Sequence, residues 1–146
     1  MIEVVTHKNL SDVLPLVKAY QQFYQNDNIS EARNRAFFSR FCDDNLRGCQ
    51  FLYRETGEVA GFVTLYFTFS SQLADDVTVL NDLYVLPEYR GRGIAKTLIE
   101  HSYQVSRERN TARLQWVTSE SNKIAQLLYN RVAKHSGTWM LYTKTH

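Results

Sequence analysis

The stretch Val77-Thr-Val-Leu-Asn-Asp-Leu-Tyr-Val-Leu-Pro-Glu-Tyr-Arg-Gly-Arg-Gly-Ile-Ala-Lys-Thr-Leu-Ile99 decides the fold. Its first part, 77–85, is rich in β-branched and aromatic residues and is soon followed by Pro87, which predicts a buried central strand. From residue 93 to about residue 109 apolar side chains recur at helical spacing, which predicts a helix. The chain therefore passes from strand to helix through a short turn that contains Gly91 and Gly93.

That turn is suited to bind a phosphate group. A strand that meets a helix through glycines leaves backbone N–H groups unpaired at the positive end of the helix dipole. Glycine has no side chain to hold an anion away, and Arg90, Arg92 and Lys96 add positive charge beside it. The pattern differs from the common dinucleotide loop, because Lys96 stands where Gly-x-Gly-x-x-Gly requires its last glycine. A tight connection without a ligand is the alternative interpretation.

The composition is that of an ordinary globular protein. The chain has 146 residues, 44% of them hydrophobic and 22% charged, which predicts a single domain over residues 1–146. A net charge of +2 without a dense basic block argues against a nucleic-acid partner. No signal peptide and no apolar run of about twenty residues is visible, so we expect a cytoplasmic protein with no membrane partner. Cys42 and Cys49 are expected to be free thiols, and the scattered histidines predict no metal site.

The remaining pattern predicts an α+β fold. Strands are expected at residues 2–6, 49–54, 59–69, 113–118 and 138–143, and helices at 11–25, 30–42 and 122–134. Antiparallel neighbours combined with a parallel crossover give a mixed sheet with helices on both faces.

Several residues mark where these elements end. Ser30 is a predicted cap of the second helix, and Asn110 is expected to end the helix that follows the glycine turn. Ser119 or Ser121 is the expected cap of the last helix. The segment from Glu55 to Glu58 predicts a hairpin turn.

The last helix carries a second candidate site. Asn122 and Tyr129 are two helical turns apart, so their side chains are expected on one face. The core-facing stripe is expected to consist of Ile124, Leu127, Leu128 and Val132. The alternative is that Asn122 only starts the helix and Tyr129 only packs.

Two motifs resemble those of a known family. Arg90-x-x-Gly-x-Ala95, preceded by Leu83-Tyr-Val-x-Pro87, resembles the acetyl-CoA-binding motif of the GNAT N-acetyltransferase superfamily. The segment from Asn122 to Tyr129 resembles the second CoA motif of that family. The motifs and the elements that link them span residues 77–130. The resemblance implies a GNAT-like three-layer α/β/α sandwich with a mixed, splayed central sheet, and it implies acetyl-CoA as the acetyl donor.

The resemblance also implies roles for individual residues. The turn would hold the pyrophosphate, the backbone of the central strand would bind the pantetheine arm and the thioester carbonyl, and Asn122 would contact the cofactor. Tyr129 would stand near the sulfur, where a phenol is a reasonable proton donor. The implied cofactor-binding residues are Leu83, Tyr84, Val85, Arg90, Gly91, Arg92, Gly93, Ile94, Ala95, Lys96 and Asn122.

The expected reaction is direct attack of a primary amine in a ternary complex. No Ser-His or Cys-His arrangement in the sequence argues for an acyl-enzyme. Asp82 lies on the strand just before the expected cofactor contacts and is the candidate base, acting through water. The alternative is a carboxylate on the sheet that pairs with an arginine.

The acceptor is expected to be a small cationic amine. Phe23, Tyr24 and Asn81 are expected to line its side of the cleft, together with the carboxylates of Asp27, Asp75, Asp76 and Asp82, because aromatic rings and carboxylates suit a cationic amine. The alternative for each of them is an ordinary solvated loop residue. The segments 12–17 and 81–85 look similar to the diamine and polyamine acetyltransferase branch, although Tyr24 and Asn81 stand where that branch has acidic residues. The segments 114–118 and 125–129 resemble the Hpa-type group, which acetylates histones, polyamines or amino acids.

Other readings of the function remain open at this point. A protein lysine or N-terminal acetyltransferase would use the same motifs on a peptide amine. A non-catalytic module that senses acyl-CoA would need the turn but not Asp82 and Tyr129. The chain also offers only 138–143 as a strand after the last helix, where the family usually has two, so we expect a homodimer that covers the unpaired edge.

Overall fold

The computed structural model describes all residues, 1–146, and has an α+β architecture. No helix in it combines the length and the apolar character that crossing a membrane requires. The elements in chain order are β1 (Ile2–Val4), α1 (Leu10–Phe23), α2 (Glu31–Asp43), β2 (Gly48–Glu55), β3 (Glu58–Ser70), β4 (Asp75–Val85), the 3-10 turn η1 (Pro87–Tyr89), α3 (Ile94–Glu108), β5 (Leu114–Gln115) and α4 (Lys123–Val132).

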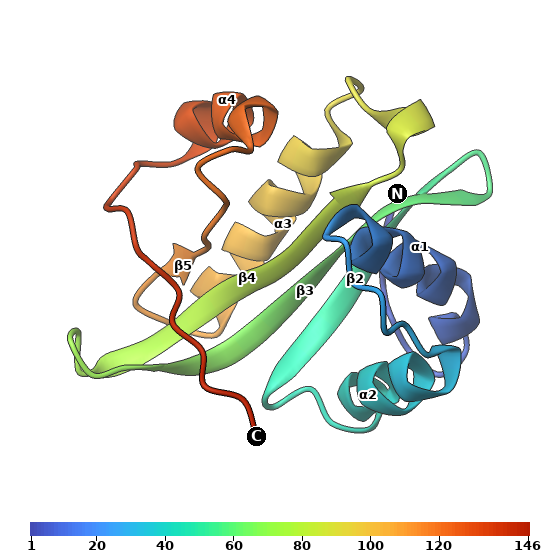
Figure 1. Cartoon of the computed structure of the whole chain (residues 1–146), viewed down its shortest axis with the longest axis horizontal. Coiled ribbons are helices and arrows are strands. Elements are labelled where there is room, and N and C mark those ends of the chain that lie inside the picture. The colour runs from blue at the N-terminus through green and yellow to red at the C-terminus, as the bar shows by residue number, and fades with distance from the viewer.

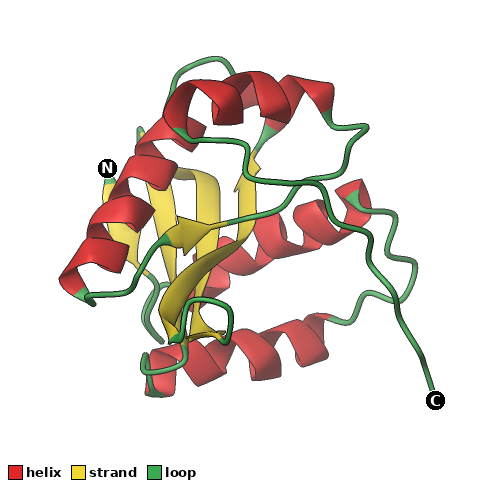
Figure 2. Ribbon diagram, turned by 90° about the vertical axis from the view of Figure 1, so that its left-hand side faces the viewer, coloured by secondary structure: helices red, strands yellow, loops and turns green.

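A mixed sheet forms the middle layer of the molecule. Its strand order is β1-β2-β3-β4-β5 (Figure 1), with antiparallel pairs from β1 to β4 and a parallel pair between β4 and β5. Helix α3 makes the crossover that the parallel pair requires. Helices cover both faces of the sheet (Figure 2), which confirms the predicted three-layer sandwich.

Each face of the sheet has its own hydrophobic core. On one face α1 and α2 pack over Leu52 and Phe62, and on the other α3 packs over Val63 and Leu65 through Leu98. All five of these side chains are fully buried. The alternation of side chains along β2 and β3 therefore separates the layer of α1 and α2 from the layer of α3.

The predicted element ends are mostly confirmed. The Ser30 hydroxyl accepts a hydrogen bond from the Arg33 N–H at 3.1 Å and caps α2. The hairpin turn between β2 and β3 has Thr56 at φ 49° and Gly57 at φ 86°, as a tight hairpin requires. Asn110 adopts φ 55° directly after α3, which ends that helix.

The start and the buried face of α4 differ from the prediction. Asn122, and not Ser119 or Ser121, caps the helix, since its Oδ1 accepts from the Ala125 N–H at 3.4 Å. The two serine hydroxyls bond each other instead. Two residues of the predicted core stripe are exposed as well, Ile124 at 84% and Leu127 at 63%, while Leu128 and Val132 pack against the α3-side core.

The end of the chain also differs from the prediction. The strand expected at 113–118 is reduced to Leu114–Gln115, and the strand expected at 138–143 is absent. The apolar side chains from Trp139 to Tyr142 are exposed. Residues 138–143 pair with no strand in this copy of the chain, and the outer edge of β5, the last strand of the sheet, stays unpaired.

Candidate active site

The site is organised by an irregularity in the central strand β4. Across the β3–β4 ladder Thr64 faces Asp82 and Leu65 faces Leu80, so Asn81 has no partner and forms a bulge. Leu80 packs in the core on the α3 side. Without the extra residue Asp82 would point to that same side, but the bulge turns its side chain to the layer of α1.

The Asp82 carboxylate lies in a closed polar environment. It is only 5% exposed and accepts a hydrogen bond from the Asn81 amide at 2.8 Å. Thr64 is its cross-strand partner, and the hydroxyl groups of Thr64 and Tyr20 act to lower the pKa of Asp82. Burial raises the pKa of Asp82 above its usual range, and the hydrogen bonds oppose that rise only in part. Hydroxyl and amide groups thus take the place of the arginine that the alternative interpretation required.

Phenol groups surround this carboxylate. The rings of Tyr20 and Tyr24 meet edge to face at 4.9 Å, and the Tyr66 hydroxyl accepts from the Asn81 amide at 3.2 Å. Burial, and after it the negative charge of Asp82, raise the pKa of each of the three phenols. Burial also raises the pKa of Tyr129, with a further contribution from Tyr24.

Phe23 lies beside the same aromatic group at the surface. Its ring is half-exposed and lies 6.3 Å from the ring of Tyr84. The Arg90 guanidinium lies 5.5 Å from the Tyr84 ring and 6.0 Å from the Phe23 ring, and its Nε donates to the Val85 carbonyl at 2.9 Å. Arg90 therefore extends along the aromatic wall beside α1 and holds the end of β4.

The glycine turn exposes a continuous run of backbone donors. The N–H groups of residues 91–96 have no acceptor within the protein, and no side chain caps α3. Gly91 and Gly93 adopt φ values of 77° and 81°, and a Cβ built on either would meet nothing within 4 Å. The concave side of this turn is thus open at the positive end of a 15-residue helix.

The charged side chains near the turn differ in their freedom. Arg92 donates to a Glu55 carboxylate oxygen at 3.0 Å and to the Glu88 carbonyl at 3.1 Å. Lys96 is exposed and forms no ion pair. Of the cations that the sequence places here, Lys96 is the one whose side chain makes no hydrogen bond, ion pair or ring contact, since Arg90 bonds the Val85 carbonyl and lies against two rings.

The C-terminal half of β4, from Leu80 to Val85, has one edge that no strand pairs with. Strand β5 pairs with β4 only at Thr78 and Val79. Because hydrogen-bonded and non-hydrogen-bonded pairs alternate, and the Leu86 N–H bonds to β3, the backbone of Leu83 and Val85 faces away from β3. The alternation turns the backbone of Tyr84 toward β3, so its predicted backbone contact with a cofactor is not available.

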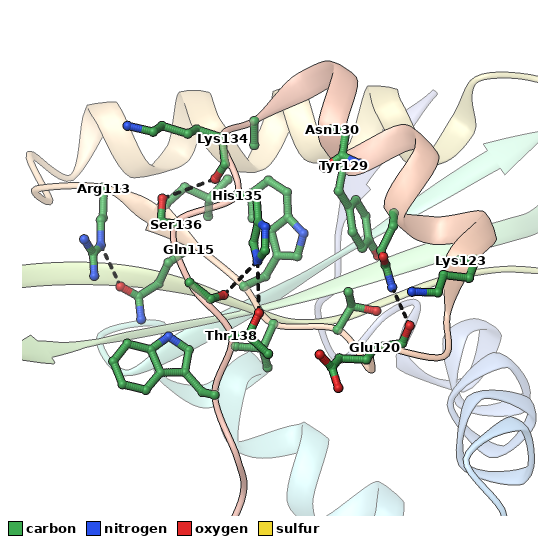
Figure 3. A pocket seen from close by; sticks show the side chains of 18 residues that line it. Arg113, Gln115, Glu120, Lys123, Tyr129, Asn130, Lys134, His135, Ser136 and Thr138 are labelled. Carbon is green, nitrogen blue, oxygen red and sulfur yellow. Dashed lines mark hydrogen bonds between the residues drawn. The ribbon is translucent and has the colours of Figure 1, made fainter.

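Tyr129 lies on α4. Its ring meets the ring of Trp116 at 5.5 Å and packs against the α3-side core. It also lines a cavity of about 470 Å³ between β5, α4 and the following segment (Figure 3). None of the other predicted site residues lines that cavity. It lies apart from the glycine turn and Asp82, and we do not assign the chemistry to it.

The sequence analysis missed part of the site. It did not identify Tyr20, Thr64, Tyr66 or Arg90 as neighbours of the acceptor side. The one signal in the sequence is Thr64, a polar residue within the otherwise apolar run Gly61-Phe-Val-Thr-Leu65. The contacts of the others depend on the bulge at Asn81, which no turn residue announces.

The chain is similar in sequence to known proteins. Residues 14–133 match the model of the acetyltransferase (GNAT) family. The D-amino-acid N-acetyltransferase HPA3 of Saccharomyces cerevisiae is 35% identical over 120 residues, which are 81% of this chain and 74% of that protein. The thialysine N-epsilon-acetyltransferase of Caenorhabditis elegans is 32% identical over 75 residues, which are 51% of this chain and 46% of that protein.

Solved structures show the same fold. A probable acetyltransferase that is 28% identical superposes with a TM-score of 0.86, and the match covers 100% of this chain and 97% of that one. The aminoglycoside N-acetyltransferase AAC(6')-Iy, solved with a bisubstrate analogue, has a TM-score of 0.85 at 19% identity, with 100% of this chain and 98% of that one covered. The protein is therefore an acetyltransferase and belongs to the GNAT family.

Proposed function

We propose that the protein transfers the acetyl group of acetyl-CoA to the primary amine of a small cationic acceptor by direct attack in a ternary complex. The observation that carries this proposal is the buried Asp82 carboxylate, placed among phenols beside the open edge of β4. Similarity to acetyltransferases named for D-amino acids and thialysine supports an amine of the size of an amino acid.

The residues of the glycine turn fit acetyl-CoA. The unpaired N–H groups of residues 91–96 and the free charge of Lys96 suit a pyrophosphate, and the open space at Gly91 and Gly93 lets it approach. Acetyl-CoA would supply the acetyl group as a thioester. The Leu83 and Val85 N–H groups would hold the pantetheine arm and the thioester carbonyl along the β4 edge. Asn122 keeps its amide nitrogen for a cofactor contact while its oxygen caps α4.

Asp82 would remove the proton that the attacking amine must lose. A primary amine is mainly protonated at neutral pH, so a base has to take a proton before or during the attack. The raised pKa of Asp82 makes it a stronger base than an exposed carboxylate. Because the carboxylate is buried, a bound water would carry the proton from the amine to it.

Tyr129 would donate a proton to the departing sulfur. Burial raises the pKa of this phenol, so it stays protonated at neutral pH and has a proton to give. Holding both reactants in place would supply much of the remaining rate enhancement.

The acceptor side favours a cation. Phe23 and Tyr24 are half-exposed at the end of α1, and their rings can meet a positive group on its way to Asp82. The Asn81 amide donates hydrogen bonds to both Asp82 and Tyr66 and so fixes the positions of these two side chains on the acceptor side. An uncharged amine would lack the attraction of the carboxylate.

We also propose that the protein works as a homodimer. The sheet ends at the two-residue strand β5, which leaves an unpaired edge. Leu141 is 90% exposed in an apolar segment near that end of the chain, and Ile124 on α4 is exposed as well. A second copy could pair with the free edge of β5 and cover these apolar side chains, so that neither is left exposed to water.

A thiol-release assay tests the proposed function. The protein is mixed with acetyl-CoA and with polyamines, amino acids in both chiralities, thialysine, aminoglycosides or basic peptides. We expect turnover that depends on an acceptor and is highest with a small cationic amine. Tight CoA binding without thiol release for any acceptor would contradict the enzymatic proposal, and release only with peptides would contradict the small-amine acceptor.

A further inference from the structure

A row of polar side chains crosses the sheet beneath Asp82. Gln50 on β2, Thr64 on β3 and Asp82 on β4 are successive cross-strand partners. They lie on the face that α1 and α2 cover, with exposed fractions of 1%, 0% and 5%. The rest of this face consists of apolar side chains such as Leu52 and Phe62. A buried polar row in such surroundings is unfavourable unless its members bond one another.

The direction of the hydrogen bonds in this row is fixed by the groups involved. The Gln50 Nε2 lies 2.9 Å from the Thr64 Oγ1, and an amide nitrogen can only donate. Thr64 therefore accepts from Gln50 and has its single hydroxyl proton left to donate. Asp82 is the direct cross-strand partner of Thr64 on the same face of the sheet, so its carboxylate is the acceptor beside that proton, and the Thr64 hydroxyl acts to lower the pKa of Asp82.

Packing of the core does not by itself explain the amide group of Gln50. Its Oε1 is buried without a hydrogen-bond partner. A leucine or methionine would fill the space without leaving a polar atom unpaired. What the amide supplies, and an apolar side chain cannot, is a donor that prevents the Thr64 hydroxyl from turning its proton away from Asp82.

No positive charge compensates Asp82, so its hydrogen bonds decide its ionisation. The titratable groups that face it are the phenols of Tyr20 on α1, of Tyr24 directly after α1 and of Tyr66 on β3. The Asn81 amide completes the set on β4 itself. Among the groups around the carboxylate, Thr64 is the most deeply buried, and Gln50 holds its hydroxyl in place.

We propose that Gln50 and Thr64 are positioning residues for Asp82: the amide orients the hydroxyl, and the hydroxyl keeps the carboxylate ionised and fixed toward the cleft. This inference rests on the proposed role of Asp82 as the base. Neither residue touches a substrate, so their effect should appear in the pH dependence of the reaction and not in substrate binding.

The test compares pH profiles of kcat/KM for matched variants. Thr64→Val removes the hydroxyl at nearly constant volume, and we expect the acid limb of the profile to move upward by about half to one pH unit. Thr64→Ser keeps the hydroxyl and should restore the wild-type limb. Gln50→Met should move the limb in the same direction by less, because the freed hydroxyl still reaches Asp82 part of the time. KM for acetyl-CoA should stay unchanged.

Thr78→Val is the control for losing a buried hydroxyl. Thr78 is fully buried on β4 and bonds Thr111 at 2.9 Å, away from Asp82. The Thr78→Val variant should therefore show the same acid limb in the pH profile of kcat/KM as the wild type. A Thr64→Val enzyme that folds and keeps the wild-type limb would overturn the proposal, as would an equal shift in Thr78→Val.

A second readout does not depend on catalysis. The carboxyl carbon of Asp82 can be titrated by NMR in the free protein, and its pKa should rise in Thr64→Val and in Gln50→Met but not in Thr64→Ser. Such a rise in a protein without any acetyl transfer would refute the proposed function and would still support the positioning of Asp82 by Gln50 and Thr64. If the enzyme is active and the carboxyl pKa of Asp82 is unchanged in Thr64→Val and Gln50→Met, only the positioning role of Gln50 and Thr64 is refuted.

Discussion

At the scale of single residues, the burial of Asp82 lowers the stability of the folded protein at neutral pH. A carboxylate that is 5% exposed and has a raised pKa is more costly to ionise in the folded protein than in the unfolded chain. Its favourable contribution to folding is present in full below the unfolded pKa and is lost as pH rises through the higher folded pKa. At neutral pH the protein therefore carries the cost of a buried charge.

Asp82→Asn should consequently stabilise the protein at neutral pH. The amide has nearly the same shape but no charge to bury, so we expect the melting temperature to rise by about 2–6 °C at pH 7. The difference should shrink as pH falls toward 4, because the wild-type carboxyl is then protonated in the folded state. Thermal unfolding followed by circular dichroism at both pH values checks this. A variant less stable than wild type at pH 7 would contradict the assignment of a raised pKa.

Tyr129→Phe should affect the chemical step and leave cofactor binding intact. The ring still packs on Trp116, while the proposed proton donor is lost, so kcat should fall about 100-fold with KM for acetyl-CoA within about threefold of wild type. Steady-state kinetics separate the two. Tyr103→Phe, which removes a phenol from the exposed side of α3, is the control and should be neutral.

The sequence, together with the family resemblance, pointed to Asp82 and Tyr129 as candidates but not to their neighbours. The acidic residue before a glycine turn and the tyrosine two helical turns after Asn122 are visible in the sequence. Their partners Thr64 and Tyr20 come from distant segments that only the folded sheet and α1 bring to the same place. Likewise Arg90 has the residue type for a phosphate contact, but the nearby rings of Tyr84 and Phe23 and the Val85 carbonyl hold its side chain elsewhere.

At the scale of elements, the β4–α3 junction combines local signals that agree. Gly91 and Gly93 adopt positive φ, α3 starts without a cap, and the N–H groups of residues 91–96 stay unpaired. All of this follows from residues adjacent in the chain, and the junction was therefore predictable. The same holds for the hairpin at Thr56 and Gly57 and for the Ser30 cap.

Gly93→Ala should weaken acetyl-CoA binding through this junction. A side chain at φ 81° is strained by about 1–2 kcal/mol, and its methyl group would also stand in the space proposed for the pyrophosphate. We expect the dissociation constant for acetyl-CoA, measured by calorimetry, to rise about tenfold or more.

Gly57→Ala is the matched control for that variant. Gly57 has φ 86° and an equally open surround, but it lies in the β2–β3 hairpin turn. It should lose similar stability and keep wild-type affinity for acetyl-CoA. If Gly93→Ala and Gly57→Ala bind acetyl-CoA with the same affinity, the glycine turn does not hold the cofactor.

Elements that depend on a distant partner were not predictable. The apolar residues at 113–118 and 138–143 have the composition of strands, yet only Leu114–Gln115 pairs with β4. The bulge at Asn81, which places Asp82, arises from the register between β3 and β4 and has no signature of its own in the sequence.

At the scale of the whole molecule, the open β5 end and the exposed segment from Trp139 to Tyr142 predict self-association. Sedimentation at tens of micromolar should give a dimer. Leu141→Asp should give a monomer with unchanged stability of the single copy, because this side chain is 90% exposed and contributes little to the core. Leu46→Asp, at an exposed apolar position before β2, is the control and should stay dimeric. A wild-type monomer at that concentration would contradict the prediction.

The most direct test of the account is the pH dependence of kcat/KM for Asp82→Asn beside wild type, measured by thiol release with the best acceptor. The wild-type value should fall on the acid side with an apparent pKa above that of an ordinary aspartate. The variant should be about 100-fold or more slower at neutral pH and should lack that acid limb. A variant with wild-type turnover, or with the same acid limb, would show that the buried carboxylate is not the base.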